Sequence, residues 1–231
     1  MIDVTRDPTP PTSLAAKPKE WGDDVIAALH RDFLRKCYLC ETWVEQGTFT
    51  VDHRRPKTLF QELEHAWTNL FPACTLFNCN GRRLKATYPS GGLLDPAADE
   101  NVETRVYQQL ENPSALLDSN AAKITFKPAQ SDDIAAVNTA IELDRIHNGT
   151  GSSKGGQRAA RALRGHINKW AVAIGDHLRQ LDTLPANAPE RAAHAQALRR
   201  LLARDAPYYM LMRSYFGPLP QVQALLDGPT P

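Results

Sequence analysis

Apolar residues recur at helical spacing in the stretch that precedes the first cysteine. Val25, Leu29 and Phe33 follow one another at intervals of four, which places them on one face of a helix. Two aspartates at the start of this stretch suit the positively polarised N-terminal end of a helix. We therefore expect a helix over residues 22–36. Residues 1–20 contain four prolines and no apolar periodicity, so we expect an extended arm or linker there.

The next part of the chain places short β-prone segments between turn-forming residues. Residues 49–52 are rich in β-branched and aromatic side chains, and residues 69–72 are interpreted as a second short strand. A short helix is expected between them over residues 59–67, and another over residues 80–85. The predicted order is therefore strand, loop, strand, helix.

The second half of the chain has a mainly helical pattern. Residues 86–130 are irregular, apart from a strand expected over residues 123–127. Ser131 is a favourable N-cap for a helix that runs to about residue 146. Further helices are expected over residues 157–182, 190–204 and 208–216.

Composition limits the class of protein. Of the 231 residues, 42% are hydrophobic, which is enough for a buried core and too many for a disordered chain. The first residues carry acids and a proline where a secretory signal would be apolar. No apolar run approaches the roughly 18 residues that a membrane-spanning helix needs. We therefore expect a soluble, cytoplasmic protein with no membrane partner.

Four cysteines fall within 43 residues of sequence: Cys37, Cys40, Cys74 and Cys79. Two residues separate the first pair, a spacing that places two thiolates on one tight turn. Four residues separate the second pair, which is wider than the commonest spacing of zinc ligands. We expect a structural zinc site, because four protein ligands leave no open position for substrate or water. Two disulfides or four buried free thiols are the alternatives.

The segment enclosed by the cysteine pairs carries residues suited to phosphodiester hydrolysis. His53 titrates near neutral pH and can take a proton from water when it is unprotonated. Asp52 and Asn80 offer hard oxygen ligands of the kind that Mg²⁺ or Mn²⁺ prefers. Such an ion polarises a phosphoryl oxygen and stabilises the leaving alkoxide. These residues are the candidate catalytic set.

The order of these motifs over residues 37–85 resembles the HNH (ββα-metal) endonuclease superfamily, in the form that ends His–Asn–Asn. The motifs are the first cysteine pair, Asp-His at 52–53, Trp-x-Asn-Leu at 67–70 and Cys-Asn at 79–80. The resemblance implies that His53 is the general base and that Asn69 pins the catalytic loop. Asp52 and Asn80 then correspond to the ligands of the catalytic ion.

A narrower resemblance, to the PtuB-type HNH nucleases of Septu and retron antiphage defence, extends over most of the chain. It rests on Pro11-Thr12-Ser13-Leu14, the Asp52-His53-x-x-Pro56-Lys57 string, Tyr88-Pro89, Asp95-Pro96 and residues 141–148. Those nucleases are partners of an ABC/AAA-like ATPase. The resemblance therefore implies an ATPase partner that binds the helical part of this chain and controls the cutting of DNA.

Basic residues near the candidate site are expected to contact the phosphates of DNA. The candidates are Arg54, Arg55, Lys57, Arg82, Arg83 and Lys85. Because the net charge is only +1, such a surface has to be local, and each of these charges could instead be merely solvated. Of the other side chains in this segment, Trp67 is expected in the core and His65 on a helix surface.

The expected organisation is α+β. It comprises an extended arm over residues 1–20, an HNH core with its four-cysteine zinc site over 21–130, and a mainly helical, partner-binding lobe over 131–231. Two alternatives stay open. A stand-alone restriction-type HNH nuclease would act without an ATPase. A non-catalytic zinc-stapled module would only bind nucleic acid or protein, and would carry the candidate catalytic residues without using them.

Overall fold

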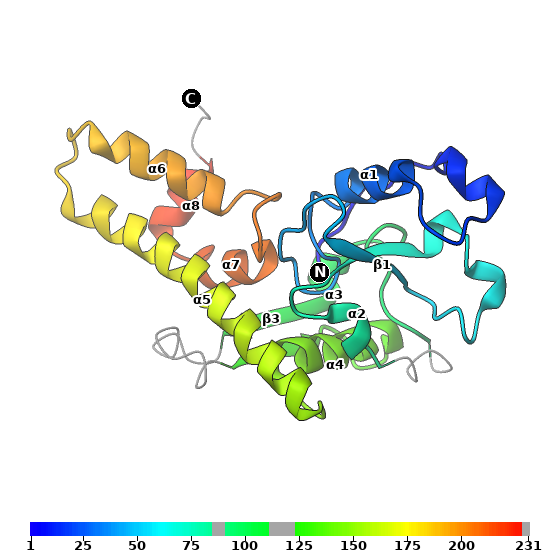
Figure 1. Cartoon of the computed structure of the whole chain (residues 1–231). Coiled ribbons are helices and arrows are strands. Elements are labelled where there is room, and N and C mark those ends of the chain that lie inside the picture. The colour runs from blue at the N-terminus through cyan, green and yellow to red at the C-terminus, as the bar shows by residue number, and fades with distance from the viewer. Residues whose placement is uncertain (85–90, 111–122, 228–231) are drawn as a thin grey trace.

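The structure is a computed structural model that describes residues 1–84, 91–110 and 123–227. It is an α+β protein with two small antiparallel sheets and mainly helical content (Figure 1). Buried apolar side chains form a core cluster whose members range along the chain from Met1 to Leu225. The expected α+β class is therefore confirmed. No described helix is both long and apolar enough to cross a membrane.

The elements alternate between short strands and helices in the first half and are helical in the second. The α-helices are α1 (Asp23–Asp32), α2 (Cys79–Arg82), α3 (Val102–Arg105), α4 (Ile134–Asn148), α5 (Lys154–Thr183), α6 (Glu190–Leu201), α7 (Tyr209–Phe216) and α8 (Pro220–Asp227). The strands are β1 (Phe49–His53), β2 (Leu70–Cys74), β3 (Val106–Leu110) and β4 (Ile124–Pro128). Short 3₁₀ turns are η1 (Thr12–Ala16), η2 (Gln61–Leu63) and η3 (Trp67–Asn69).

Helix α1 packs its predicted apolar face against β2. Val25 and Leu29 are fully buried, and Phe33, just after the helix, meets Phe71 of β2 edge-on with ring centroids 5.3 Å apart. The helix is shorter than the 22–36 expected. It ends at Asp32 because Leu34 and Arg35 adopt left-handed backbone conformations, with φ of 54° and 59°. This turn directs the chain toward the first cysteine pair.

Strands β1 and β2 form the first sheet, at the positions expected. They run antiparallel, with Phe49 opposite Cys74 and His53 opposite Leu70. The connection between them contains η2 and η3 instead of the expected helix. Within this connection the side chain of Asn69 donates to the Leu63 carbonyl at 3.1 Å. The chain then enters α2 through Asn78, which is left-handed with φ of 48°. Strand, loop, strand and helix thus follow in the expected order.

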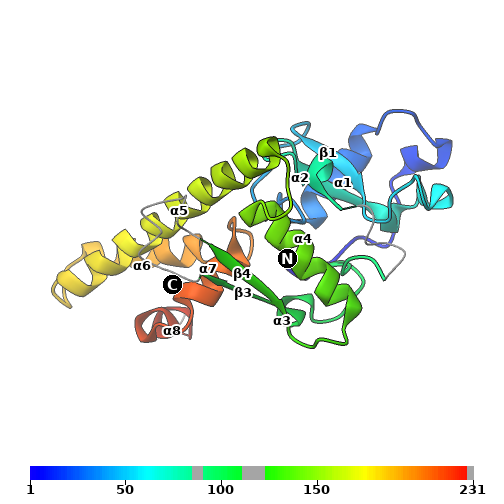
Figure 2. The same ribbon diagram turned by 90° about the horizontal axis from the view of Figure 1, so that it is seen from below.

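The second sheet pairs β3 with β4, and α4 packs against it (Figure 2). The sequence pattern predicted β4 but not β3. Helix α4 begins later than expected, because the side chain of Asp133, and not that of Ser131, accepts the Ala136 N–H at 3.1 Å. Arg105, which precedes β3, binds Asp133 in turn, with Nε 2.7 Å from Oδ2. The core therefore continues across residue 131, where a separate helical lobe was expected to begin.

The long helix α5 extends away from this core, and α6 packs along its far half (Figure 1). Its buried positions recur at helical spacing: Ala160, Leu163, Ile167, Ala171, Ile174 and Leu178. Helix α8 contacts α6, and α7 returns to pack against β3. The resulting arm of α5, α6 and α8 projects to one side of the two sheets in Figure 1.

Residues 1–20 have little regular structure but are packed into the protein. Met1, Ile2 and Leu14 are buried. The guanidinium of Arg6 lies 4.6 Å from the ring centroid of Phe71. Parts of the segment that was expected to be an extended arm or linker therefore pack against the core.

Candidate functional site

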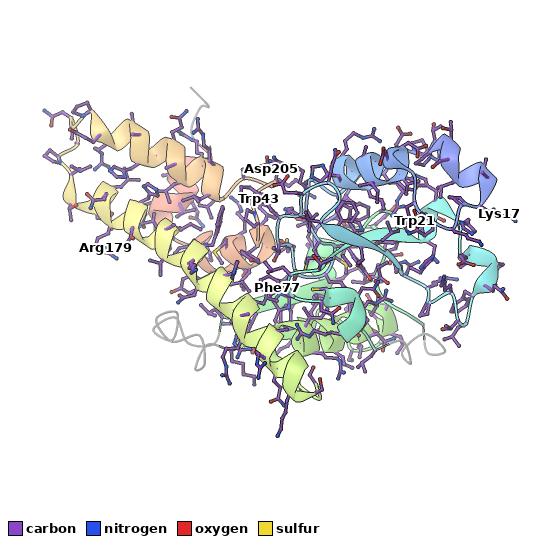
Figure 3. The ribbon with its side chains drawn as sticks, in the orientation of Figure 1. Lys17, Trp21, Trp43, Phe77, Arg179 and Asp205 are labelled. Atoms are coloured by element: carbon purple, nitrogen blue, oxygen red, sulfur yellow. The ribbon has the colours of Figure 1, made fainter. Side chains whose placement is uncertain are left out.

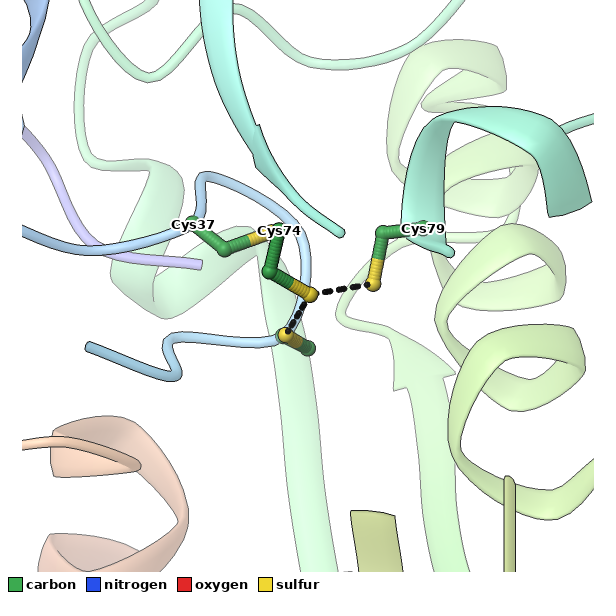
Figure 4. A group of neighbouring side chains, drawn as sticks. Cys37, Cys74 and Cys79 are labelled. Carbon is green, nitrogen blue, oxygen red and sulfur yellow. Dashed lines mark hydrogen bonds between the residues drawn. The ribbon is translucent and has the colours of Figure 1, made fainter. Parts of the chain in front are cut away.

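The four cysteines meet in the interior of the protein. Cys37 and Cys40 lie in the turn after α1, Cys74 ends β2 and Cys79 begins α2. All four are buried, and their Sγ atoms lie within 4.8 Å of one another. The Sγ of Cys74 is 3.5 Å from that of Cys40 and 3.4 Å from that of Cys79 (Figure 4). Four soft donors at such separations suit a tetrahedral ion such as zinc, whose bonds to thiolate are about 2.3 Å long.

The backbone of the first cysteine turn is closely held. The Cys37 N–H donates to the Thr42 carbonyl at 2.9 Å, and the Glu41 N–H donates to the Cys37 carbonyl at 3.0 Å. Burial, together with contacts to neighbouring thiols, raises the pKa of the Cys40 thiol. A buried cluster of this kind becomes fully ionised only with a cation to balance it. All four cysteines are free, so the pair of disulfides is not formed in this structure.

A cavity of about 630 Å³ lies at the end of β1, next to α2. Its lining includes three of the predicted catalytic residues and four residues from the segment before α1: Asp52, His53, Asn80, Lys17, Pro18, Lys19 and Trp21. The structure thus brings together side chains that are 63 positions apart in the sequence (17 to 80).

His53, the last residue of β1, is half-buried and is held through one ring nitrogen. Its Nε2 lies 2.9 Å from the carbonyl oxygen of Glu64. Because a carbonyl only accepts hydrogen bonds, Nε2 carries the proton and Nδ1 of the neutral ring keeps its lone pair. Burial lowers the pKa of His53 below its usual value. The imidazole is therefore neutral at pH 7 and can accept a proton.

Asn69 lies outside the cavity and connects two stretches of its wall. Its Oδ1 accepts the Arg55 N–H at 2.7 Å, and its Nδ2 donates to the carbonyls of Arg55 and Leu63 at 3.0 and 3.1 Å. Arg55 follows His53 by two residues, and Leu63 precedes the residue whose carbonyl holds His53. The amide thus fixes the loop on both sides of the imidazole, which is the geometry that a loop-pinning role requires.

Asp52 is buried, and one of its oxygens is already engaged. Its Oδ2 accepts the Tyr38 hydroxyl at 2.6 Å and forms an ion pair with Arg83. Arg83 also donates to the carbonyls of His53 and Arg54, at 3.0 and 2.6 Å. Arg83 follows α2 directly, and α2 contains Asn80. The contacts of Arg83 therefore connect α2 with the end of β1. The Oδ1 of Asp52 takes no part in these contacts.

Three of the predicted phosphate-binding arginines are used inside the protein. Besides Arg83, these are Arg54, whose Nε lies 3.1 Å from Asp95, and Arg82, which donates to the Ile146 carbonyl at 2.6 Å. Burial lowers the pKa of Arg82. These contacts favour a structural role for all three side chains over the expected contact with the phosphates of DNA.

The remaining basic candidates are near the surface or outside the described residues. Arg55 and Lys57 are exposed, and Lys57 pairs with Glu64 at 2.7 Å. Lys85 lies outside the described residues, as does the Tyr88-Pro89 motif. A phosphate-binding surface built from these candidates alone would therefore comprise Arg55 and Lys57 in the described part of the chain.

Two aromatic side chains of the cavity were not expected there. Trp21 lies with its ring centroid 5.8 Å from that of His53 and 5.7 Å from that of His65. His65 lines the cavity and does not lie on a helix surface, since it follows the short 3₁₀ turn η2 and no α-helix forms over residues 59–67. The sequence signal for Trp21 was its position between two lysines and α1, which is too weak to assign it to a site. Trp67, in contrast, is buried in the core as expected.

The arrangement places a neutral imidazole, a carboxylate and an amide beside one cavity, next to a closed cluster of four thiols. The imidazole, carboxylate and amide can activate water and bind a hard cation, and the four thiols can bind a soft cation. No family model, no curated protein and no solved structure matches this chain.

Proposed function

We propose that this chain is a metal-dependent endonuclease of the HNH (ββα-metal) type that hydrolyses the phosphodiester bonds of DNA. One observation carries the proposal: Asp52, His53 and Asn80 line a single cavity, and the Glu64 carbonyl holds His53 in the tautomer that a general base needs. The order β1, β2, α2 and the contacts of Asn69 support it.

The four cysteines would hold a structural zinc ion. Such an ion would tie the turn after α1 to the end of β2 and the start of α2. Asn80, the proposed ligand of the catalytic ion, directly follows Cys79. The bond between zinc and Cys79 would therefore also fix the backbone next to Asn80. Removal of zinc is therefore expected to affect the cavity as well as the fold.

Asp52 and Asn80 would hold the catalytic ion, Mg²⁺ or Mn²⁺. Both offer oxygen donors, and Asp52 keeps Oδ1 outside its contacts with Tyr38 and Arg83. When bound, the ion polarises a phosphoryl oxygen and stabilises the leaving alkoxide. Few protein ligands suffice, because Mg²⁺ usually keeps several waters and completes its shell with substrate phosphate.

His53 would act on the attacking water. Its Nδ1 takes a proton from the water as the water oxygen bonds to phosphorus, and the bond from phosphorus to the leaving oxygen breaks. The contact with Glu64 keeps the ring oriented, and Asn69 keeps the contact in place. The proton on His53 is then returned to solvent before the next turnover.

We also propose an ABC/AAA-like ATPase partner that controls cutting in antiphage defence, in the cytoplasm. The sequence resemblance supports this partner, and an uncontrolled DNA nuclease would endanger its host. The projecting arm of α5, α6 and α8 is the proposed binding region, because it lies away from β1, whose end borders the cavity (Figure 1). A restriction-type enzyme that acts alone is the alternative within the same chemistry.

One observation favours the second alternative, a non-catalytic zinc-stapled module. The Asp52 carboxylate is already balanced by the buried Arg83 guanidinium, as in an ordinary structural ion pair. In that case the cavity would bind a ligand without cutting it. The two functions differ in what happens to DNA when a divalent ion is supplied.

The test is incubation of the zinc-loaded protein with supercoiled plasmid, with Mg²⁺, with Mn²⁺ or without either ion, and with or without a genetically linked ATPase. Cutting that requires the added ion supports the endonuclease, and dependence on the ATPase supports control by a partner. Binding of DNA without cutting under every condition supports the non-catalytic module.

A further inference from the structure

The cavity has a wall that the catalytic proposal does not use. Residues 17–21 lie between η1 and α1, and Lys17, Lys19 and Trp21 of this segment line the cavity. Both lysines are exposed, and Trp21 is partly buried. Figure 3 shows Lys17 at the outer edge of the molecule and Trp21 further in, toward β1. The segment thus reaches from solvent to the site.

The charges of this wall are not balanced by the acids of the cavity. Of the two carboxylates that line it, Asp52 pairs with Arg83 and Glu64 pairs with Lys57. Glu20 belongs to the segment but does not line the cavity. Lys17 and Lys19 therefore supply positive charge at the cavity of a protein whose net charge is only +1. Such a local excess attracts a polyanion to this point of the surface.

The segment is held firmly on the side of η1. Leu14 is buried in the core, and its carbonyl accepts the Lys17 N–H at 3.0 Å. Ser13 donates its N–H and its hydroxyl to Asp24 of α1, at 2.9 and 2.5 Å. These hydrogen bonds lower the pKa of Asp24 and fasten η1 to the helix on the other side of the segment. The lysines are thus presented by a fixed support, which reduces the entropy lost on binding.

Trp21 offers a flat apolar surface next to the proposed general base. Its ring packs against those of His53 and His65, with centroids 5.8 and 5.7 Å away, and part of it remains accessible. Aromatic side chains in this setting bind single-stranded nucleic acid by stacking with a base, and this contact does not depend on sequence. A tryptophan here therefore suits a nucleotide that is held close to His53.

We infer that residues 17–21 form the DNA-binding wall of this cavity. Lys17 and Lys19 bind phosphates of the strand that enters the site, and Trp21 packs against a base beside the phosphate that is cut. This inference deepens the proposed function and rests on it for the identity of the polyanion. It assigns to the N-terminal segment the phosphate contacts that Arg54, Arg82 and Arg83 do not make, because those side chains are held by groups of the protein itself.

The test is the binding of fluorescently labelled single-stranded and duplex DNA, measured by anisotropy at several salt concentrations without added Mg²⁺ or Mn²⁺. The zinc-loaded variants are Lys17→Ala/Lys19→Ala, Lys17→Arg/Lys19→Arg and Trp21→Ala. The matched control is Lys127→Ala/Lys169→Ala, which removes two exposed lysines that do not line the cavity.

We expect the Lys17→Ala/Lys19→Ala variant to bind DNA about tenfold more weakly and to lose about 1.8 from the slope of log affinity against log salt for duplex DNA. The arginine variant restores binding, because it restores the charge. Trp21→Ala weakens binding to the single strand more than to the duplex and leaves the salt slope unchanged. The control changes affinity less than about twofold.

Failure of this inference can be told apart from failure of the nuclease proposal. Normal DNA binding by Lys17→Ala/Lys19→Ala, or an equal loss in the control variant, overturns the inference, whether or not the wild type cuts plasmid. If DNA binding depends on the two lysines but the wild type never cuts, the inference is supported and the nuclease proposal is overturned. A wild type that neither binds nor cuts DNA overturns both.

Discussion

The Nε2 atom of His53 lies 2.9 Å from the carbonyl oxygen of Glu64, 11 residues further along the chain. This contact decides which nitrogen carries the proton and leaves Nδ1 as the basic atom. It joins the end of β1 to the loop that returns to β2, and the side chain of Asn69 binds Arg55 and Leu63, which lie close to the two partners in the sequence. The strand end and the loop are therefore held together around the imidazole.

Replacement of Asn69 by alanine is expected to reduce both stability and cutting. Asn69 is buried, and its side chain makes three hydrogen bonds to backbone groups. Their loss should lower the free energy of unfolding by about 2 kcal/mol, because buried partners stay unpaired. Denaturant unfolding and plasmid cutting measure the two effects. Cutting at the wild-type rate by the folded variant would contradict the assigned positioning role.

The rate of cutting should follow the protonation of His53. Because burial lowers the pKa of His53 below the usual 6.5, its neutral form persists to a lower pH than that of a free histidine. The rate is therefore expected to rise with pH, to reach half its maximum below pH 6.5, and to stay level above it. Single-turnover cutting across the pH range measures this profile. A midpoint well above pH 6.5 would exclude His53, as it is placed here, as the base.

Arg83 is expected to act as a structural partner of Asp52 and not as a phosphate contact. Removing the guanidinium in Arg83→Met leaves a buried carboxylate unpaired, which should cost about 3–5 kcal/mol. The double variant Asp52→Asn/Arg83→Met removes the charge as well and should recover part of that loss. Thermal or denaturant unfolding measures both. An Arg83→Met protein of wild-type stability with weakened DNA binding would restore the original expectation for Arg83.

The zinc site should be required for the fold around it. Cys74→Ser removes one of four buried ligands, so the purified variant is expected to lose the metal and to unfold at a lower temperature than the wild type. Metal analysis and thermal unfolding give the two results. The control is Ser214→Ala, which removes a single hydroxyl from α7 and leaves the cysteine cluster intact. Wild-type protein purified under reducing conditions with no bound metal would contradict the site.

The sequence predicted the elements whose side-chain periodicity is clear. Strand β1 and the apolar face of α1 lie where the pattern placed them, because their apolar side chains alternate or recur as the core requires. Strand β3 was missed. Only its end residues Val106 and Leu110 are buried, and its centre is polar or exposed. Its pairing with β4 is a tertiary contact that no local pattern reveals.

The grouping of the cysteines and of the predicted catalytic residues could also be expected from the sequence. The internal contacts of the arginines could not be expected from the sequence. A basic residue in a sequence does not show whether carbonyl groups elsewhere in the fold will accept its hydrogen bonds. Arg82, for instance, is held by the carbonyl of Ile146, 64 residues away. Likewise, the position of Trp21 beside His53, on which the proposed role of residues 17–21 depends, is a tertiary contact that the sequence does not reveal.

The most direct test of the central claim compares plasmid cutting by the wild type, His53→Ala and His30→Ala, with Mg²⁺ or Mn²⁺ and with the linked ATPase where one exists. His30 is a matched control because its Nε2 also lies near a backbone carbonyl, that of Val44 at 3.0 Å, but it belongs to α1 and does not line the cavity. We predict that His53→Ala cuts at least about 100-fold more slowly, while its zinc content is unchanged and His30→Ala cuts normally. Equal cutting by the wild type and His53→Ala, or no cutting by the zinc-loaded wild type under any of these conditions, would contradict the claim.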